Sequence, residues 1–592
     1  MSLADFALGL FEPLGKVVGR FVEKDLDAGL LRIYPPAYGS IVIFVTLISA
    51  TISFSSWIVL TVLGFVHVFT LPLVLLIPAS VFLLLFYYPK IRVADRSSAL
   101  ENETPFAAAY IAVMSTGGIS PYISITRLGR FYLLPSLREF AKILEIKVNG
   151  LGLDPVSAIE EVAKNLPSRE FKELLLGYAS TLRAGGDVVH FLMRRTELLF
   201  QRSLATLKII GERMGQIMEI YMIVAIIFSL GIYSIFTVGV SLSSIMPAGA
   251  MGFFGSSVAL FLFGYILMPM ISVVFLWFID ISQLKQPSED YTPYIIYLGT
   301  FVPTLVVLGT IFSLSFIVVP LGNIELIRTL RSPVVILCNY LNLPHGFEST
   351  VGLALTLMIG TIPAAIYQAY IDFLEGGIEH EMANFLRDLV EVRKSGLSPE
   401  KCIINLSERS YGKLSKHLKL IARQLNWGIS FSKVYETFSK SVKNWLAKAM
   451  FFLLIDSIEV GGGMPETLET LATFNESMIQ SEREKSETMK PLTVIPYIGS
   501  GTLVLVIVVL LAFFNSILSI AHSGVPYGDM VMALLPPVIV QSYLMGLVSG
   551  KVATTKTSQG FKHAILLVLF SLMVIALVPY VNKAIAISSL SS

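Results

Sequence analysis

Residues 118–121 read Gly-Ile-Ser-Pro, and residues 396–399 read Gly-Leu-Ser-Pro, 278 positions further along the chain. Further glycines follow each copy in nearly the same register: Gly152 corresponds to Gly428, and the pair Gly185-Gly186 corresponds to Gly461-Gly462, each at a separation of 276. Three landmarks at a nearly constant separation indicate an internal duplication.

The repeated element has the pattern of a junction between two helices. Gly118 and Gly396 are placed to end one helix in the left-handed conformation, the following serine to cap the next helix, and Pro121 or Pro399 to occupy its first turn. Apolar residues then recur at helical spacing in each copy: Leu137, Phe140, Leu144 and Val148; Phe171, Leu174, Tyr178 and Leu182; Leu414, Leu418, Ile421 and Leu425. Ser136 with Glu139 fits a capping box. We therefore predict two all-α bundles of about five or six helices each.

The composition places the rest of the chain in lipid. Apolar residues make up 54% and charged residues 15% of the 592 residues, and the mean hydropathy is +0.73. Nine segments are apolar enough and long enough to cross a bilayer. Two lie within 38–88; the others are about 219–240, 251–278, 294–319, 351–370, 492–514, 530–548 and 564–581.

These patterns predict a polytopic all-α membrane protein with about nine transmembrane helices and two repeated helical-bundle domains on the cytoplasmic side. The predicted parts are an N-terminal arm (1–37), a transmembrane hairpin (38–90), a first helical domain (91–215), four spans (216–371), a second helical domain (372–490) and three spans (491–592). The arm carries Leu14, Val17 and Phe21 at helical spacing opposite charged residues, which predicts a helix at the inner membrane surface with a possible kink at Pro13.

The distribution of basic residues predicts the orientation. Each helical domain holds 16 of the 44 Lys and Arg residues. A cytoplasmic N-terminus places 41 of the 44 basic residues inside and leaves Arg328, Arg331 and Lys583 outside, in agreement with the positive-inside rule. The C-terminus is then predicted outside the cell membrane.

The sequence lacks the local motifs of common enzymes and cofactor sites. It contains no Gly-x4-Gly-Lys-Ser/Thr phosphate loop, no Cys-x2-Cys or His-Glu-x2-His metal spacing and no Gly-x-Ser-x-Gly nucleophile elbow. We therefore predict no catalytic residues, cofactor or metal, and no nucleic-acid partner. Glu219, next to the start of the third span, is either a membrane-entry carboxylate with a function or an interfacial side chain near the headgroups.

A duplicated helical domain with a Gly-x-Ser-Pro turn and a later double glycine, each copy running into transmembrane helices, resembles the GspF/PilC/TadC family. That family consists of inner-membrane platform proteins of type II secretion and type IV pilus machines. Four further stretches resemble its archaeal branch, which includes the platforms of archaella and archaeal pili. They are residues 88–92 (Tyr-Pro-Lys-Ile-Arg), 149–155 (Asn-Gly-Leu-Gly-Leu-Asp-Pro), 182–187 (Leu-Arg-Ala-Gly-Gly-Asp) and 219–221 (Glu-Ile-Tyr) at the entry to the membrane. The second copy departs from the pattern of residues 182–187 at residues 458–464.

The resemblance implies a protein without its own chemistry. A separate hexameric ATPase would dock on the cytoplasmic side, and its movements would lift pilin-like or archaellin subunits from the bilayer into a filament. It also implies a homo-oligomer. Candidate partner-facing residues surround the double glycines, which are either tight helix turns or points where another backbone approaches: Arg183, Gly185, Gly186, Asp187, Glu459, Gly461 and Gly462. The alternative function is a secondary transporter or channel built on the duplication.

Overall fold

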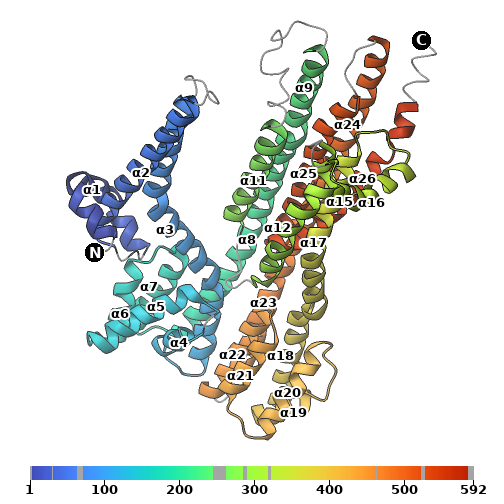
Figure 1. The fold of residues 1–592 in the computed structure, drawn as a ribbon. Helices are drawn as coiled ribbons and strands as arrows, with labels where there is room; N and C mark the ends of the chain where they lie inside the picture. The colour runs from blue at the N-terminus through green and yellow to red at the C-terminus, as the bar shows by residue number, and fades with distance from the viewer. Residues whose placement is uncertain are drawn as a thin grey trace. The chain divides into compact units, whose positions relative to one another are not determined.

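The computed structural model describes residues 3–29, 31, 33–62, 71–131, 133–243, 262–283, 290–317, 322–461, 463–521 and 527–583. All regular secondary structure in this part of the chain is helical, which confirms the predicted all-α fold (Figure 1). The chain divides into two compact units. Unit 1 contains residues 1–199 and 453–471, and unit 2 contains residues 200–285, 289–452 and 472–592.

Eight helices among the described residues have the length and hydropathy of membrane spans. They are Pro35–Ile58, Val188–Phe236, Leu262–Ser282, Thr292–Ile317, Glu348–Lys394, Pro465–Asn515, Tyr527–Thr554 and Thr557–Lys583. Each of them overlaps one of the nine predicted spans. The remaining predicted span is the second arm of the hairpin, and it falls partly on residues 63–70, outside the described part. The count of nine therefore stays a prediction.

Each helical domain contains six helices that follow one another in the same order. In the first domain they are α3 (Leu71–Thr116), α4 (Pro121–Leu128), α5 (Pro135–Glu145), α6 (Pro155–Lys164), α7 (Arg169–Arg183) and α8 (Val188–Met222). In the second they are α18 (Ile378–Lys394), α19 (Pro399–Leu406), α20 (Leu414–Asn426), α21 (Phe431–Ser441), α22 (Trp445–Gly461) and α23 (Pro465–Met489). A π-helical turn, η2 (Ile146–Gly150), extends α5.

The helix junction predicted from the repeat is confirmed in both copies. Gly118 and Gly396 have φ angles of +79° and +88°. The hydroxyl groups of Ser120 and Ser398 each accept a hydrogen bond from the backbone N–H three residues later. Pro121 and Pro399 begin α4 and α19, where the missing N–H would have had no partner within the helix.

The predicted capping box at Ser136 and Glu139 is wrong. Ser136 lies inside α5, and the carboxylate of Glu103 on α3 accepts the backbone N–H groups of Ser136 (3.2 Å) and Leu137 (2.8 Å). Glu381, 278 residues after Glu103, does the same for Leu414 at the start of α20 (2.9 Å). Each repeat therefore caps the same helix with a carboxylate from its first helix, which satisfies backbone donors that a helix start leaves without partners.

The N-terminal arm forms α1 (Leu3–Ala28), which packs against α2 (Pro35–Val62). The backbone leaves helical geometry at Phe11, two residues before Pro13, so the predicted kink is present. A side chain at Gly39 would overlap the carbonyl oxygen of Gly15, so the two helices meet at their backbones. The predicted apolar side chains at Leu14, Val17 and Phe21 lie on another face and are exposed. That face is free to contact the headgroup region of a bilayer.

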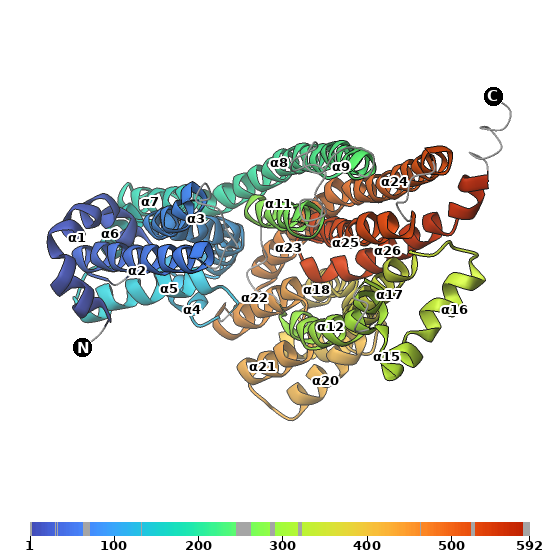
Figure 2. The same ribbon diagram turned by 45° about the horizontal axis from the view of Figure 1, so that its top comes forward.

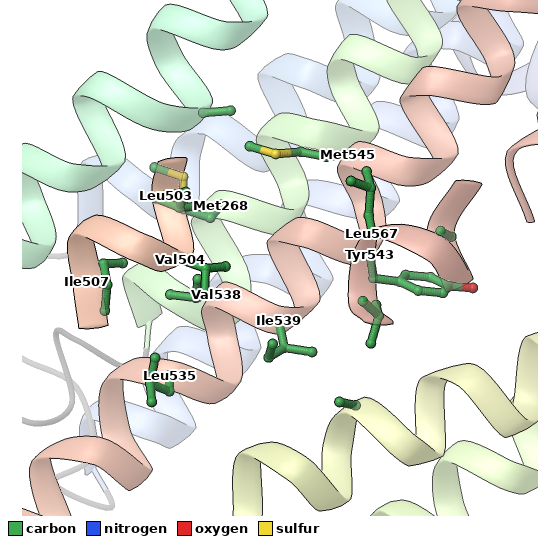
Figure 3. Packing of buried hydrophobic residues seen from close by; sticks show 14 of the residues in the cluster. Met268, Leu503, Val504, Ile507, Leu535, Val538, Ile539, Tyr543, Met545 and Leu567 are labelled. Carbon is green, nitrogen blue, oxygen red and sulfur yellow. The ribbon is translucent and has the colours of Figure 1, made fainter. Parts of the chain in front are cut away.

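Helix α25 (Tyr527–Thr554) is at the centre of the membrane bundle in unit 2, and most of its side chains are buried. Around it lie α9 (Ser229–Ser243), α11 (Met268–Ser282), α12 (Thr292–Gly309), α17 (Glu348–Glu375), α24 (Val494–Ala521) and α26 (Gly560–Ile575). Figure 3 shows Leu535, Val538 and Ile539 of α25 packed with side chains of neighbouring helices. Short helices α13 (Ser315–Ile317), α15 (Glu325–Leu330) and α16 (Ser332–Tyr340) connect α12 to α17.

Small residues let α25 and α26 approach at backbone distance. A Cβ atom added at Gly550 would overlap Gly560, and one added at Gly546 would overlap the backbone of Ala564. Helices in lipid gain much of their association energy from such close packing, because burial of apolar side chains alone gives little advantage over lipid.

We therefore expect Gly550→Ala to lower the stability of the detergent-purified protein by about 1–3 kcal/mol, because the added methyl group forces the two helices apart. Gly231→Ala is the matched control, since a Cβ there meets no atom within 4 Å. Thermal unfolding midpoints compare the two variants, and equal midpoints would contradict the packing described here.

The Glu103 cap is expected to depend on pH. Burial raises the pKa of Glu103 from 4.5 to about 7, although the two backbone N–H groups act in the opposite direction. Because the folded state binds the proton more tightly than the unfolded state, this carboxyl group lowers stability as pH rises from about 4.5 to 7. In hydrogen–deuterium exchange, α5 of the wild type should lose protection relative to Glu103→Gln between pH 5 and pH 8. Parallel behaviour of the two proteins across this range would show that Glu103 does not titrate there.

Candidate functional site

The first double-glycine turn joins α7 to α8 and is built from local hydrogen bonds. Gly185 has φ of +70°, and the N–H of Gly186 donates to the carbonyl oxygen of Thr181 at 2.9 Å. The carboxylate of Asp187 accepts the N–H of His190 at 2.9 Å and so caps α8. Two of the predicted partner-facing residues, Gly185 and Asp187, therefore have clear local structural roles.

Among the described residues, no other backbone approaches this turn. A Cβ added at Gly185 would meet no atom within 4 Å, and one added at Gly186 would first meet the Thr181 methyl group at 3.1 Å. The space beside the glycine pair is therefore not filled by this chain, and the interpretation that another backbone approaches there stays a prediction. Gly185 is needed for its left-handed conformation, which other residues rarely adopt.

Arg183 ends α7 beside this turn. Its guanidinium group forms an ion pair with Glu160 of α6 at 2.8 Å, and its side chain remains 57% exposed. It also donates a weak hydrogen bond to Ser157 at 3.4 Å. The charge is thus held on the surface by one neighbour and is still available to a partner.

The second turn joins α22 to α23. Helix α22 ends at Gly461, and Gly462 lies outside the described residues. The left-handed residue is Gly463, with φ of +59°, and it follows Gly185 by the same 278 residues that separate Gly118 from Gly396. The structural counterpart of Gly185 is therefore Gly463, two residues beyond the predicted Gly461. Glu459 lies just before this turn with an exposed side chain.

A buried polar cluster lies one helical turn before Glu459. The Tyr110 hydroxyl group, on α3, donates to Oδ2 of Asp456 on α22. The Arg127 guanidinium group, on α4, contacts the same carboxylate through Nη2 (2.5 Å to Oδ1) and Nε (3.2 Å to both oxygens). Asp456 is 7% exposed. Tyr110, Arg127 and Asp456, which we call the Asp456 cluster, all belong to unit 1.

The cluster is electrostatically closed. The hydrogen bond from Arg127 to Asp456 is the main cause that raises the pKa of Arg127, and the negative charge of Glu459 raises this pKa further. Burial, together with the adjacent carboxylate, raises the pKa of Tyr110 far above its ordinary value. The three groups satisfy one another and hold a fixed geometry, so the cluster fastens α22 of the second repeat to α3 and α4 of the first.

Sequence reasoning missed this cluster. One signal was available: Asp456 is the sole charged residue between Lys448 and Glu459, in an otherwise apolar helix. A carboxylate in such a place requires a partner. The partners lie 329 and 346 residues away, and one sequence gives no means to identify them.

Glu219 does not join the buried network of the membrane bundle. Its side chain is exposed on α8. Two residues later, the Tyr221 hydroxyl group is fully buried and lies 3.2 Å from Oγ of Ser272, which donates to Oε1 of Gln541 on α25 (3.2 Å). The polar contact between α8 and the membrane core is therefore made by Tyr221.

Replacing Asp456 by Asn should destabilise the protein by about 3 kcal/mol, because the Arg127 charge then lacks its counter-ion in a mostly buried position. Hydrogen–deuterium exchange should show the loss in α22 and α4. Glu459→Gln, an exposed change one turn away, is the control and should have little effect. Unchanged exchange in the Asp456→Asn protein would mean that the cluster does not hold α22.

Comparison with known proteins agrees with the duplication. The family model "Type II secretion system (T2SS), protein F" matches the chain twice, at residues 107–236 and 385–512. An uncharacterized protein of Methanocaldococcus jannaschii is 20% identical over 464 residues, which cover 76% of this chain and 72% of the relative. No solved structure matches the chain. Each matched segment begins in the first helix of a helical domain and ends in the membrane span that follows it, so the chain contains the type II secretion system protein F domain twice.

Proposed function

We propose that this protein is the non-enzymatic membrane platform of a type IV pilus-like machine, such as an archaellum, a pilus or a type II secretion system. It couples a hexameric cytoplasmic ATPase to the insertion of pilin-like or archaellin subunits into a filament. The two matched domains imply a membrane platform of this kind of machinery. The archaeal relative supports an archaeal version of it.

The observation that carries this proposal is the direct helical connection between each helical domain and the membrane. The helix that starts at Val188 continues to Phe236, and the helix that starts at Pro465 continues to Asn515, over 49 and 51 residues. About 20 residues suffice to cross a bilayer. Each of these helices therefore has more than half of its length outside the hydrocarbon layer, and a displacement of that part is passed to the span.

The two connections are equivalent in the duplication. Val188 follows the left-handed Gly185 by three residues, and Pro465 follows the left-handed Gly463 by two. The protein thus has two helical connections to the membrane that begin at the same kind of turn. A push on either helical domain, produced by ATP hydrolysis in a separate subunit, would reach the bilayer through one of them.

The charge distribution supports an orientation with the N-terminus and both helical domains in the cytoplasm and the C-terminus outside the cell membrane. The two domains carry 32 of the 44 basic residues. In this orientation the ATPase reaches the domains from the cytoplasm, and the pilin-like subunits reach the spans from within the bilayer. The platform would act as a homo-oligomer beneath the growing filament.

The interior of the membrane bundle gives little support to the alternative, a transporter. Among the described spans, the polar groups on α25 form uncharged contacts, such as the Tyr543 hydroxyl group with those of Tyr297 (2.8 Å) and Thr361 (2.9 Å). The buried Lys551 forms an ion pair with Asp280, and both lie in the last turns of their helices. A proton or ion pathway needs ionisable groups deep in the bundle.

The proposal is tested by co-purification of the full-length protein with the assembly ATPase of the same organism. If the double-glycine turns contact the ATPase, Arg183→Glu and Glu459→Arg should each reduce the ATPase recovered and the number of filaments per cell by about tenfold. Glu160→Gln is the control for Arg183, because it removes the local ion pair without reversing the charge at position 183. Full ATPase recovery with both reversals would reject these positions, and failure of the wild type to bind any assembly ATPase would reject the platform function.

A further inference from the structure

The exposed face of α20 in the second helical domain carries three basic side chains and a tryptophan in one line. Lys416, Lys419 and Arg423 are exposed, and Trp427, directly after the helix, is 78% exposed. The spacings of three, four and four residues place the four side chains on one side of the helix. We call them the basic stripe. The opposite face of α20 packs into the domain through Leu414, Leu418, Ile421 and Ala422.

The charge of the stripe is not neutralised within the domain. From Arg409 to Tyr435 the sequence contains six Lys and Arg residues and no Asp or Glu. Three of the six have local partners: Arg409 pairs with Asp388 at 3.1 Å, Lys413 donates to the carbonyl oxygens of Phe373 and Gly376, and Arg423 donates weakly to the carbonyl oxygen of Lys419 at 3.4 Å. In the part of the chain that the structure describes, no carboxylate forms an ion pair with the basic residues of the stripe.

The first repeat shows that the fold does not require this surface. On the equivalent helix, α5, Glu139 pairs with Arg96 at 3.4 Å. Lys147, in the turn that follows, pairs with Glu161 at 2.6 Å. Leu151 holds the place of Trp427, and it too is exposed, at 67%. Both repeats thus present an apolar side chain at this turn. In the second repeat the charged residues of the helix before it are all basic, whereas in the first repeat they include Glu139.

The position of α20 argues against lipid as the ligand of the stripe. Within unit 2, α20 and α21 lie at the end opposite to the spans α24 and α26, beyond α18 (Figures 1 and 2). An exposed tryptophan next to basic residues could otherwise indicate a headgroup region. At this end of the unit, the occupant has to come from the aqueous phase.

We infer that the basic stripe is the docking surface for an acidic protein surface that also has an apolar recess for the Trp427 indole. Tryptophan and arginine are the residue types that contribute most often to binding energy at protein interfaces. The lysines attract and orient the acidic partner, and the indole, which is exposed in the free protein, becomes buried in the complex. This inference rests on the proposed function in one respect: the assembly ATPase is the partner that we assign to the stripe.

The first experiment measures binding of the purified ATPase to the full-length protein in nanodiscs. The variants are Trp427→Ala and the triple reversal Lys416→Glu, Lys419→Glu and Arg423→Glu, each of which should weaken binding by at least about tenfold. Binding of the wild type should also weaken with added salt, which screens exposed charges. The matched control reverses Arg138 and Lys142, which are exposed on the equivalent helix of the first repeat, and should bind normally. Wild-type affinity in both stripe variants, with normal elution and unfolding, would overturn the inference and leave the platform function intact.

The second experiment does not depend on the ATPase. A photo-crosslinking amino acid replaces Trp427 in cells, and position 151 serves as the comparison. A protein adduct that disappears on reversal of the three basic residues supports the docking surface. If that protein is not the ATPase, the docking surface stands while the ATPase assignment fails. An adduct with lipid, an adduct with a second copy of this chain, or no adduct would overturn the inference.

Discussion

The demand of the backbone for hydrogen bonds within lipid governs the architecture of this protein. A chain segment in hydrocarbon has no water to satisfy its N–H and C=O groups, so it must be helical throughout its passage. Here helical structure also continues beyond the bilayer, because the helices from Val188 and from Pro465 run from each helical domain into the membrane, with a π-helical segment at Ile223–Phe228 and a 3-10 turn at Lys490–Thr493. The backbone hydrogen bonding that permits insertion is therefore the same as that which connects each domain to its span.

The residues that end and cap helices recur between the two copies at a constant separation, whereas many other side chains differ. Left-handed glycines recur at Gly118 and Gly396 and at Gly185 and Gly463, and a carboxylate from the first helix of each domain caps α5 and α20, from Glu103 and Glu381. All three pairs are separated by 278 residues. A glycine turn and a cap fix where one helix ends and another begins, so their recurrence preserves the bundle while the surfaces diverge.

Much of the fold could be predicted from the sequence because its signals are local. Spans follow from runs of apolar residues, and the junctions at Pro121 and Pro399 follow from four consecutive letters. The cap of α5 was missed because its acceptor, Glu103, lies more than 30 residues before the helix it caps. The Asp456 cluster was missed for the same reason at a larger scale, and the second left-handed glycine was misplaced because three consecutive glycines offer no local means to choose Gly463.

The two repeats use equivalent helices for different purposes. In α22 of the second repeat, Asp456 faces inward and binds Tyr110 and Arg127 of the first repeat. The residue at the corresponding position before the left-handed glycine of the first repeat is Tyr178 in α7. Tyr178 and its neighbour Ala179 pack in the apolar core. The face of α22 that carries Asp456 is closed by the first repeat and is not available to a partner, although Glu459 near the end of the helix is exposed. A partner can use other surfaces, and α20, whose basic side chains form no ion pair within the described part of the chain, offers one of them.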